Sequence, residues 1–223
     1  MSSQLAEDLR AFGPVGLFAG LIILLSGNIS VGQITVPVGA ILVLIWARAS
    51  RTPWREIGYV RPESWIGSLA IGLVFGVVFK FAMKAIVMPL IGAPPINQAY
   101  HYLAGNRAML PSAILAMLLA GFGEETVFRG YLFERLGKLL GSSAGAKAAI
   151  VVITAVVFGL AHYPNQGLPG VEQALVTGLV FGAIFAATGR LWMLMCAHAA
   201  FDLTALAIIY WNLESDIAHL IFR

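Results

Sequence analysis

Apolar residues fall into seven runs that are long enough to cross, or nearly cross, a lipid bilayer. The hydrocarbon core is spanned by about 20 helical residues. The third run contains Lys80 and Lys84 and predicts either one tilted helix or a span followed by a short interfacial helix. The pattern therefore predicts an all-α, polytopic transmembrane helical bundle of seven to eight helices. The candidate spans are 11–27, 31–47, 65–91, 108–133, 147–162, 171–188 and 191–211.

The composition supports a membrane protein. Of the 223 residues, 59% are hydrophobic and 11% are charged, whereas about 25% are charged in soluble domains. We therefore expect residues 1–223 to form a single integral membrane domain. The basic residues are scattered singly, which argues against a nucleic-acid-binding face, and the lone Cys196 excludes an intrachain disulfide framework or a Cys-rich zinc site.

The positive charges predict how the chain is oriented. They gather in 48–64, 135–147 and 189–190, which the positive-inside rule places in the cytoplasm together with the N-terminus. Glu7 and Asp8 precede the first run, so we read it as a retained span and not as a cleavable signal. The compact chain carries no eukaryotic targeting signal, and we expect a bacterial inner membrane.

The stretch "GFGEETVFRG", residues 121–130, places three charges inside an apolar run. Glu125 and Arg129 are four residues apart, so they share a helix face and are expected to form an ion pair. Glu124 points about 100° away and has no obvious partner. An unpaired carboxylate in the membrane is a poor structural device but a good general base.

Two histidines and an aspartate also lie in or next to apolar runs. His162 ends one run and could simply be interfacial. His198 and Asp202 are four residues apart in the last run and could form a satisfied pair, a metal half-site or part of a catalytic centre. Glu124 and His162 each lie 19 residues from residue 143, the centre of the turn "GSSAG". In an antiparallel hairpin they reach similar depth, and Asp202 is offset by only about 6 Å, so we expect one polar catalytic pocket inside the membrane.

Three short motifs carry a resemblance to a known family. "EETVFR" (124–129) resembles its EExxxR motif, "FGLAH" (158–162) its FxxxH motif, and "HAAFD" (198–202) its histidine followed four residues later by Asn or Asp. In this order they resemble the CPBP family of CAAX proteases and bacteriocin-processing enzymes, also called Abi or type II CAAX prenyl endopeptidase-like proteins. The resemblance covers a catalytic core at about residues 110–207.

The resemblance implies an intramembrane endopeptidase. By that resemblance Glu124 and His162 would activate the attacking water, and His198 and Asp202 would stabilise the oxyanion or bind a catalytic ion. Glu125, Arg129 and Phe158 would support the site. Several eukaryotic members have Asn where this chain has Asp202. An ionised Asp cannot donate to an oxyanion, so Asp202 would have to be protonated, orient His198 or coordinate a cation.

The residues leave two mechanisms open. In the favoured one no metal takes part. In the other, His162, His198, Asp202 and Glu124 supply ligands for a divalent cation such as zinc, although the chain lacks the compact HExxH pattern.

The sequence also leaves the biological role partly open. The expected substrate is a membrane-associated peptide or protein, such as a leader peptide, a bacteriocin-like peptide or a membrane-protein tail. The alternatives are a non-proteolytic scaffold or bacteriocin-immunity protein of the same fold, and a proton-coupled transporter. A transporter is disfavoured because no inverted repeat is visible. The oligomeric state is left open.

Overall fold

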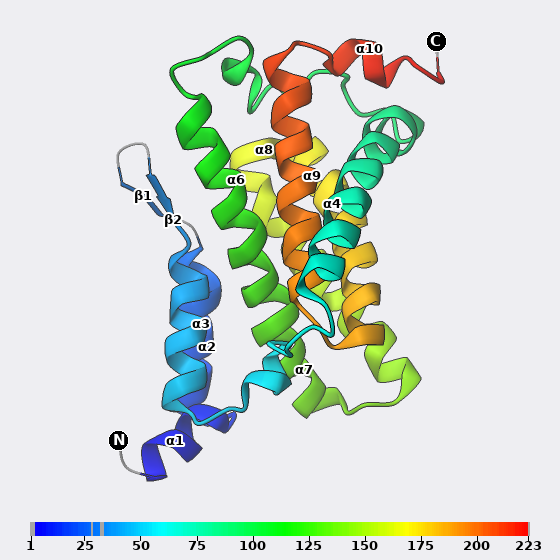
Figure 1. The fold of residues 1–223 in the computed structure, drawn as a ribbon. Coiled ribbons are helices and arrows are strands. Elements are labelled where there is room, and N and C mark those ends of the chain that lie inside the picture. Colours follow the sequence, from blue (N-terminus) through cyan, green and yellow to red (C-terminus); the bar gives the residue numbers. More distant parts are fainter. Residues whose placement is uncertain (1–2, 28, 32–33, 223) are drawn as a thin grey trace.

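The computed structural model describes residues 3–27, 29–31 and 34–222 as a helical bundle with one short hairpin (Figure 1). The all-α prediction is thus confirmed for the body of the molecule. The α-helices are α1 (Ser3–Arg10), α2 (Pro14–Ser26), α3 (Val38–Ala49), α4 (Trp65–Ala82), α5 (Met88–Leu90), α6 (Leu110–Glu124), α7 (Phe133–Leu140), α8 (Ala144–Thr188), α9 (Trp192–Tyr210) and α10 (Glu214–Ala218). Short 3-10 helices are η1 (Trp54–Ile57) and η3 (His101–Leu103), and π-helices are η2 (Met83–Val87) and η4 (Glu125–Leu132).

Within the described residues, four continuous helical segments are long and apolar enough to cross a membrane. They are Trp65–Leu90, Leu110–Leu140, Ala144–Thr188 and Trp192–Tyr210. A fifth span is obtained if α1 and α2, which meet at a bend of 62°, count as one. The chain is therefore an integral membrane protein. The long run with two lysines is one continuous helix, in which a π-turn (η2) joins α4 to α5.

The helix α8 is a hairpin of two arms. Its 45 residues would extend about 68 Å if straight, more than twice the hydrocarbon thickness. Gly167 breaks it with φ 62° and ψ −159°. A Cβ on Gly178 would lie 2.9 Å from the Cα of Ala155, and one on Gly182 would lie 3.3 Å from the Val151 side chain. The arms therefore run antiparallel, and they correspond to the predicted spans 147–162 and 171–188.

The predicted span 31–47 is wrong in its first half. The chain there forms an antiparallel hairpin of β1 (Ile29–Val31) and β2 (Ile34–Val36), with Ser30 paired to Thr35. β-branched residues favour strands, and a proline disfavours helical geometry in the residue before it. Pro37 caps α3, which has only 12 residues, about 18 Å.

The helix α9 lies at the centre of the bundle against glycine-bearing faces of two neighbours. A Cβ on Gly76 of α4 would lie 2.1 Å from the Ala197 carbonyl oxygen, and one on Gly121 of α6 would lie 2.6 Å from the Ala199 nitrogen. Small residues let membrane helices approach this closely. This packing fixes the position of α9, which carries His198 and Asp202.

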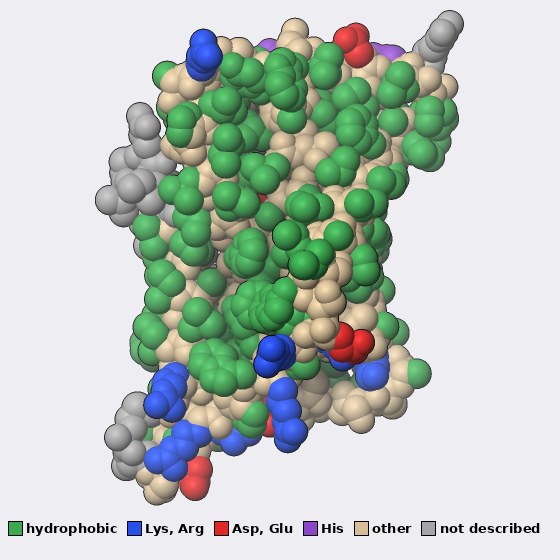
Figure 2. Space-filling view, viewed as in Figure 1, with side chains coloured by type: hydrophobic (Ala, Val, Ile, Leu, Met, Phe, Trp, Pro, Cys, Tyr) green, Lys and Arg blue, Asp and Glu red, His purple; other side chains and the backbone are tan. Residues whose placement is uncertain are grey.

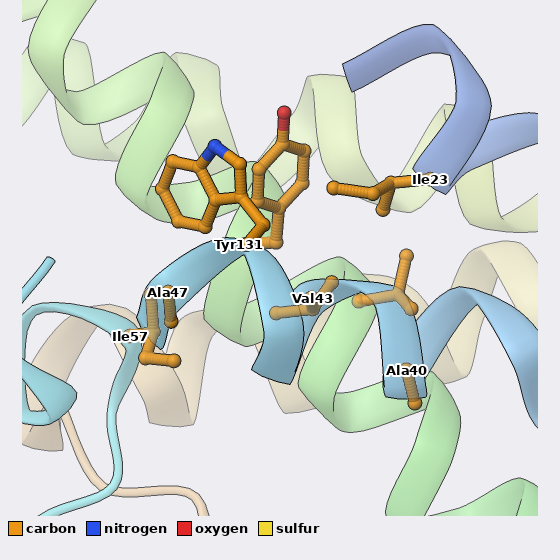
Figure 3. Close-up of a cluster of buried hydrophobic side chains, with 8 residues drawn as sticks. Ile23, Ala40, Val43, Ala47, Ile57 and Tyr131 are labelled. Carbon is orange, nitrogen blue, oxygen red and sulfur yellow. The ribbon is translucent and has the colours of Figure 1, made fainter. Parts of the chain in front are cut away.

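A hydrophobic cluster holds η4 against the N-terminal helices. Figure 3 shows Tyr131 of η4 packed among side chains of α2, α3 and η1, including Ile23, Val43 and Ile57. The Tyr131 ring meets the ring of Trp46 edge-on, with centroids 4.8 Å apart. The wide π-turn is therefore braced from the side opposite α9.

The loops separate into two ends as the charge pattern predicts. Glu56 lies 3.5 Å from Arg10 and 3.4 Å from Lys138, and Glu63 lies 2.9 Å from Arg190. The three basic loops and the N-terminus therefore share one end. Figure 2 shows most Lys and Arg side chains of the visible face at this end and hydrophobic side chains over the middle. The assignment of this end to the cytoplasm stays a prediction.

Candidate active site

The π-helix η4 buries a charge pair inside the bundle. Nη1 of Arg129 donates to Glu125 Oε1 at 2.8 Å, and the side chains of Arg129 and Glu125 are 2% and 0% exposed. This is the pairing that the spacing predicts. Arg129 also donates to the Gly178 carbonyl at 3.4 Å and lies over the rings of Phe158 and Phe181, at 4.7 and 5.6 Å. The guanidinium thus ties η4 to both arms of α8.

Glu125 has a second partner that the sequence reasoning missed. The Nδ1 of His198 lies 2.8 Å from the same Oε1 that accepts from Arg129. Among the described residues, the other oxygen of Glu125, Oε2, has no hydrogen-bond partner. A carboxylate paired with Arg129 only accepts hydrogen bonds, so Nδ1 of His198 carries a proton. Glu125 therefore fixes the orientation of the imidazole, in addition to pairing with Arg129.

The opposite nitrogen of His198 faces two further carboxyl groups. Its Nε2 lies 3.7 Å from Glu124 Oε2 and 3.7 Å from Asp202 Oδ2. These distances exceed a direct hydrogen bond and are in the range that a bridging water spans. The side chains of Glu124 and Asp202 are 20% and 21% exposed, whereas that of His198 is 7% exposed. Glu124, His198 and Asp202 thus converge as the spacing predicts.

The imidazoles of His162 and His198 both lie near the ring of Phe158. The ring centroid of Phe158 is 4.6 Å from that of His162 and 6.0 Å from that of His198. Nδ1 of His162 donates to the Phe158 carbonyl at 2.8 Å, which leaves Nε2 as the nitrogen that can accept a hydrogen bond. In the described structure no hydrogen bond or ion pair joins His162 to Glu124.

Tyr100 lies close enough to Asp202 and Glu124 to be affected by their charges, and the sequence did not single it out. Burial, followed by the charges of Asp202, Glu124 and Tyr102, raises the pKa of Tyr100 to about 12, against a hydrogen bond with Gln166 that lowers it. The Gln166 amide lies 3.4 Å from its hydroxyl. Tyr100 lies in the loop before η3, where no motif or periodicity marks it.

A catalytic zinc ion is held by three protein side chains arranged around it. Among the described residues, no group of three or more His, Cys, Asp or Glu side chains is arranged to hold a metal ion. Nδ1 of His198 is engaged by Glu125, and Nδ1 of His162 is engaged by the Phe158 carbonyl. The residues as arranged do not fit the predicted zinc ligand set, and no step is assigned to a metal.

Comparison with known proteins supports the resemblance seen in the sequence. No curated protein and no solved structure matches the chain. The model of the family described as type II CAAX prenyl endopeptidase Rce1-like matches residues 106–204. That range contains all three motifs, from Glu124 to Asp202. Residues 106–204 are therefore similar to the type II CAAX prenyl endopeptidase Rce1-like family.

Proposed function

We propose that this protein is an intramembrane endopeptidase that hydrolyses a peptide bond in a membrane-associated protein or peptide. The observation that supports this most directly is the environment of His198, whose Nδ1 is held by buried Glu125 while Nε2 faces Glu124 and Asp202. Ionisable groups inside a membrane are costly and usually functional. Glu125 and Arg129 neutralise each other, whereas among the described residues no Lys or Arg lies within ion-pair distance of Glu124, which suits the role of general base.

The proposed reaction begins with a water bound by Glu124. Glu124 takes a proton from this water as its oxygen forms a bond to the peptide carbonyl carbon. Nε2 of His162, left as an acceptor by the bond to the Phe158 carbonyl, helps to orient the same water. When the tetrahedral intermediate collapses, the carbon–nitrogen bond breaks and Glu124 returns its proton to the leaving amine. Glu124 thus acts first as base and then as acid.

His198 is proposed to stabilise the oxyanion. Three carboxyl groups lie around His198, and only one guanidinium lies nearby to balance their charge. A second proton on the imidazole therefore lowers the net negative charge of the pocket. Its Nε2–H then donates to the carbonyl oxygen as negative charge develops there. In this scheme Asp202 stabilises the imidazolium, and Glu125 and Arg129 hold it in place.

The proposed setting is a bacterial inner membrane, and the proposed substrates are leader peptides, bacteriocin-like peptides or membrane-protein tails. The test is incubation of the purified protein in lipid nanodiscs with a peptide library, followed by mass spectrometry of the products. We expect new termini with wild-type protein and none with Glu124→Ala. A cellular effect that persists in Glu124→Ala would instead point to a scaffold or immunity protein.

A further inference from the structure

A cavity lies beside the proposed site at the end of the molecule that carries the C-terminus. Its volume of about 210 Å³ equals the share of about seven liquid waters. It lies between α4, the region of α8 around the Gly167 break, and α9, and Figure 1 shows these helices together near α10. Apolar walls such as Met88 and Ile208 alternate with polar and charged groups, which are Lys80, Lys84, Asn97, Gln98, Gln166, Gln173 and Glu214. Glu124, His162, His198 and Asp202 are not among its lining residues.

Lys80 is a buried cation without an acidic partner in contact. The residue is 6% exposed, and its Nζ donates to Gln173 Oε1 at 2.8 Å and lies 4.6 Å from the Phe201 ring centroid. Among the described residues no carboxylate lies within ion-pair distance of it. An ammonium has three N–H donors, and a buried charge is costly unless it is paired. A ligand with a negative charge in the cavity would offset that cost.

Unlike Lys80, the neighbouring Lys84 has an acidic partner within ion-pair distance. Its Nζ donates to the Pro95 carbonyl and lies 3.7 Å from Glu214. Glu214 also accepts from the Asn97 backbone N–H at 2.7 Å and contacts His101 at 3.2 Å. Lys84 is therefore neutralised within the fold, so Lys80 is the lysine of this cavity that is free to bind an anion.

The cavity adjoins the proposed catalytic groups through two contacts. Gln166 lines the cavity and is hydrogen-bonded to Tyr100, whose hydroxyl is within electrostatic reach of Glu124 and Asp202. Phe201, against which Lys80 lies, directly precedes Asp202. A peptide whose scissile bond lies near Glu124 could therefore extend a neighbouring residue into the cavity.

We propose that this cavity is a substrate subsite in which Lys80, aided by the Gln173 amide, binds a carboxylate of the peptide. The assignment rests on the proposed peptidase function. The carboxylate could be the free C-terminus of the substrate or the side chain of an Asp or Glu near the scissile bond. Both present the same two oxygens to an ammonium, and the apolar walls accommodate the adjoining aliphatic side chains.

The experiment measures binding instead of turnover. Glu124→Gln protein in nanodiscs is titrated calorimetrically with the acetylated tripeptide Val-Leu-Ala as the free acid and as the C-terminal amide. A second pair carries an internal Asp or Asn, both with amidated ends. We expect the carboxylate form of one pair to bind about ten- to hundredfold more tightly, as for a charge-assisted hydrogen bond. The pair that shows the preference identifies the source of the carboxylate.

The same titrations in Lys80→Met and Lys84→Met backgrounds assign the effect. Lys80→Met keeps most of the side-chain volume and removes a buried charge, a change that is often tolerated, and it should abolish the preference. Lys84→Met is the matched control and should keep it. Equal binding of acid and amide in both pairs, or a preference that survives Lys80→Met, overturns the subsite. Turnover by Glu124→Gln would instead overturn the catalytic assignment and leave this result standing.

Discussion

Arg129 provides the sharpest test of how the charged segment is tolerated in the membrane. Replacing Arg129 with Met leaves Glu125 buried beside an imidazole and without its guanidinium. Both side chains of the pair are 2% exposed or less, so solvent does not screen the loss. Removing one partner of a buried pair costs about 3–5 kcal/mol, and we expect a loss of that size in the free energy of unfolding.

A surface pair of nearly the same length serves as the matched control. Arg190 lies 2.9 Å from Glu63, and their side chains are 42% and 86% exposed. Exposed pairs contribute roughly 0–1 kcal/mol, so Arg190→Met should change stability little. The assay is equilibrium unfolding by sodium dodecyl sulfate in mixed micelles, followed by circular dichroism. The double variant Glu125→Leu with Arg129→Met should recover part of the lost stability, because neither charge of this pair is then left buried without the other.

The reasoning about this pair is refuted by either of two results. One is a loss below about 1 kcal/mol for Arg129→Met, equal to that of the exposed pair. The other is a double variant that is less stable than Arg129→Met alone. Either result would mean that the Arg129 guanidinium is not the charge partner that makes buried Glu125 tolerable.

Three further predictions concern packing, titration and metal dependence. Gly76→Ala should lower the unfolding free energy by more than about 1 kcal/mol, because a Cβ there would lie 2.1 Å from the Ala197 carbonyl oxygen. The control is Gly137→Ala, because nothing lies within 4 Å of a Cβ at that position. This substitution should be neutral or stabilising by up to about 1 kcal/mol. Because the pKa of Tyr100 in the fold, about 12, is above the ordinary value of 10.0, its contribution to stability is present below pH 10 and is lost as pH rises towards 12. Between pH 9 and 11, wild type should lose about 1 kcal/mol more stability than Tyr100→Phe, and an equal loss would contradict the burial of that hydroxyl. Protein stripped of metal by chelation, with metal content checked by mass spectrometry, should keep full peptidase activity; activity restored only by added zinc would support the alternative mechanism.

Helix positions and the approximate grouping of the polar residues could be predicted from the sequence. Apolar runs report burial in lipid directly, and spacings of four residues report a shared helix face, which is why the Glu125–Arg129 and His198–Asp202 contacts follow from the sequence. Depth arithmetic predicted similar depths for Glu124, His162 and Asp202, and the structure brings Glu124 and Asp202 together beside His198. The arithmetic could not show that Nδ1 of His162 bonds to the Phe158 carbonyl.

What the sequence could not supply depends on rotation and long-range packing. The π-turn from Glu125 changes which side chains face α9, and this lets Glu125 reach His198. The hairpin before α3 arises because β-branched residues and Pro37 outweigh an apolar run. Tyr100 and Lys80 reach the region of the site through tertiary contacts between segments far apart in the chain, and no local pattern encodes these contacts.

The two adjacent glutamates test the central claim most directly, because the same substitution is made at neighbouring positions. Cleavage of a peptide identified in the library screen is measured together with unfolding in micelles. Glu124→Gln should lower kcat by about 10²–10⁴ and leave the unfolding free energy within about 0.5 kcal/mol of wild type. Glu125→Gln should lower the unfolding free energy by about 3 kcal/mol or more, because Arg129 loses its buried partner. Wild-type turnover by Glu124→Gln would contradict the assignment of Glu124 as the catalytic base.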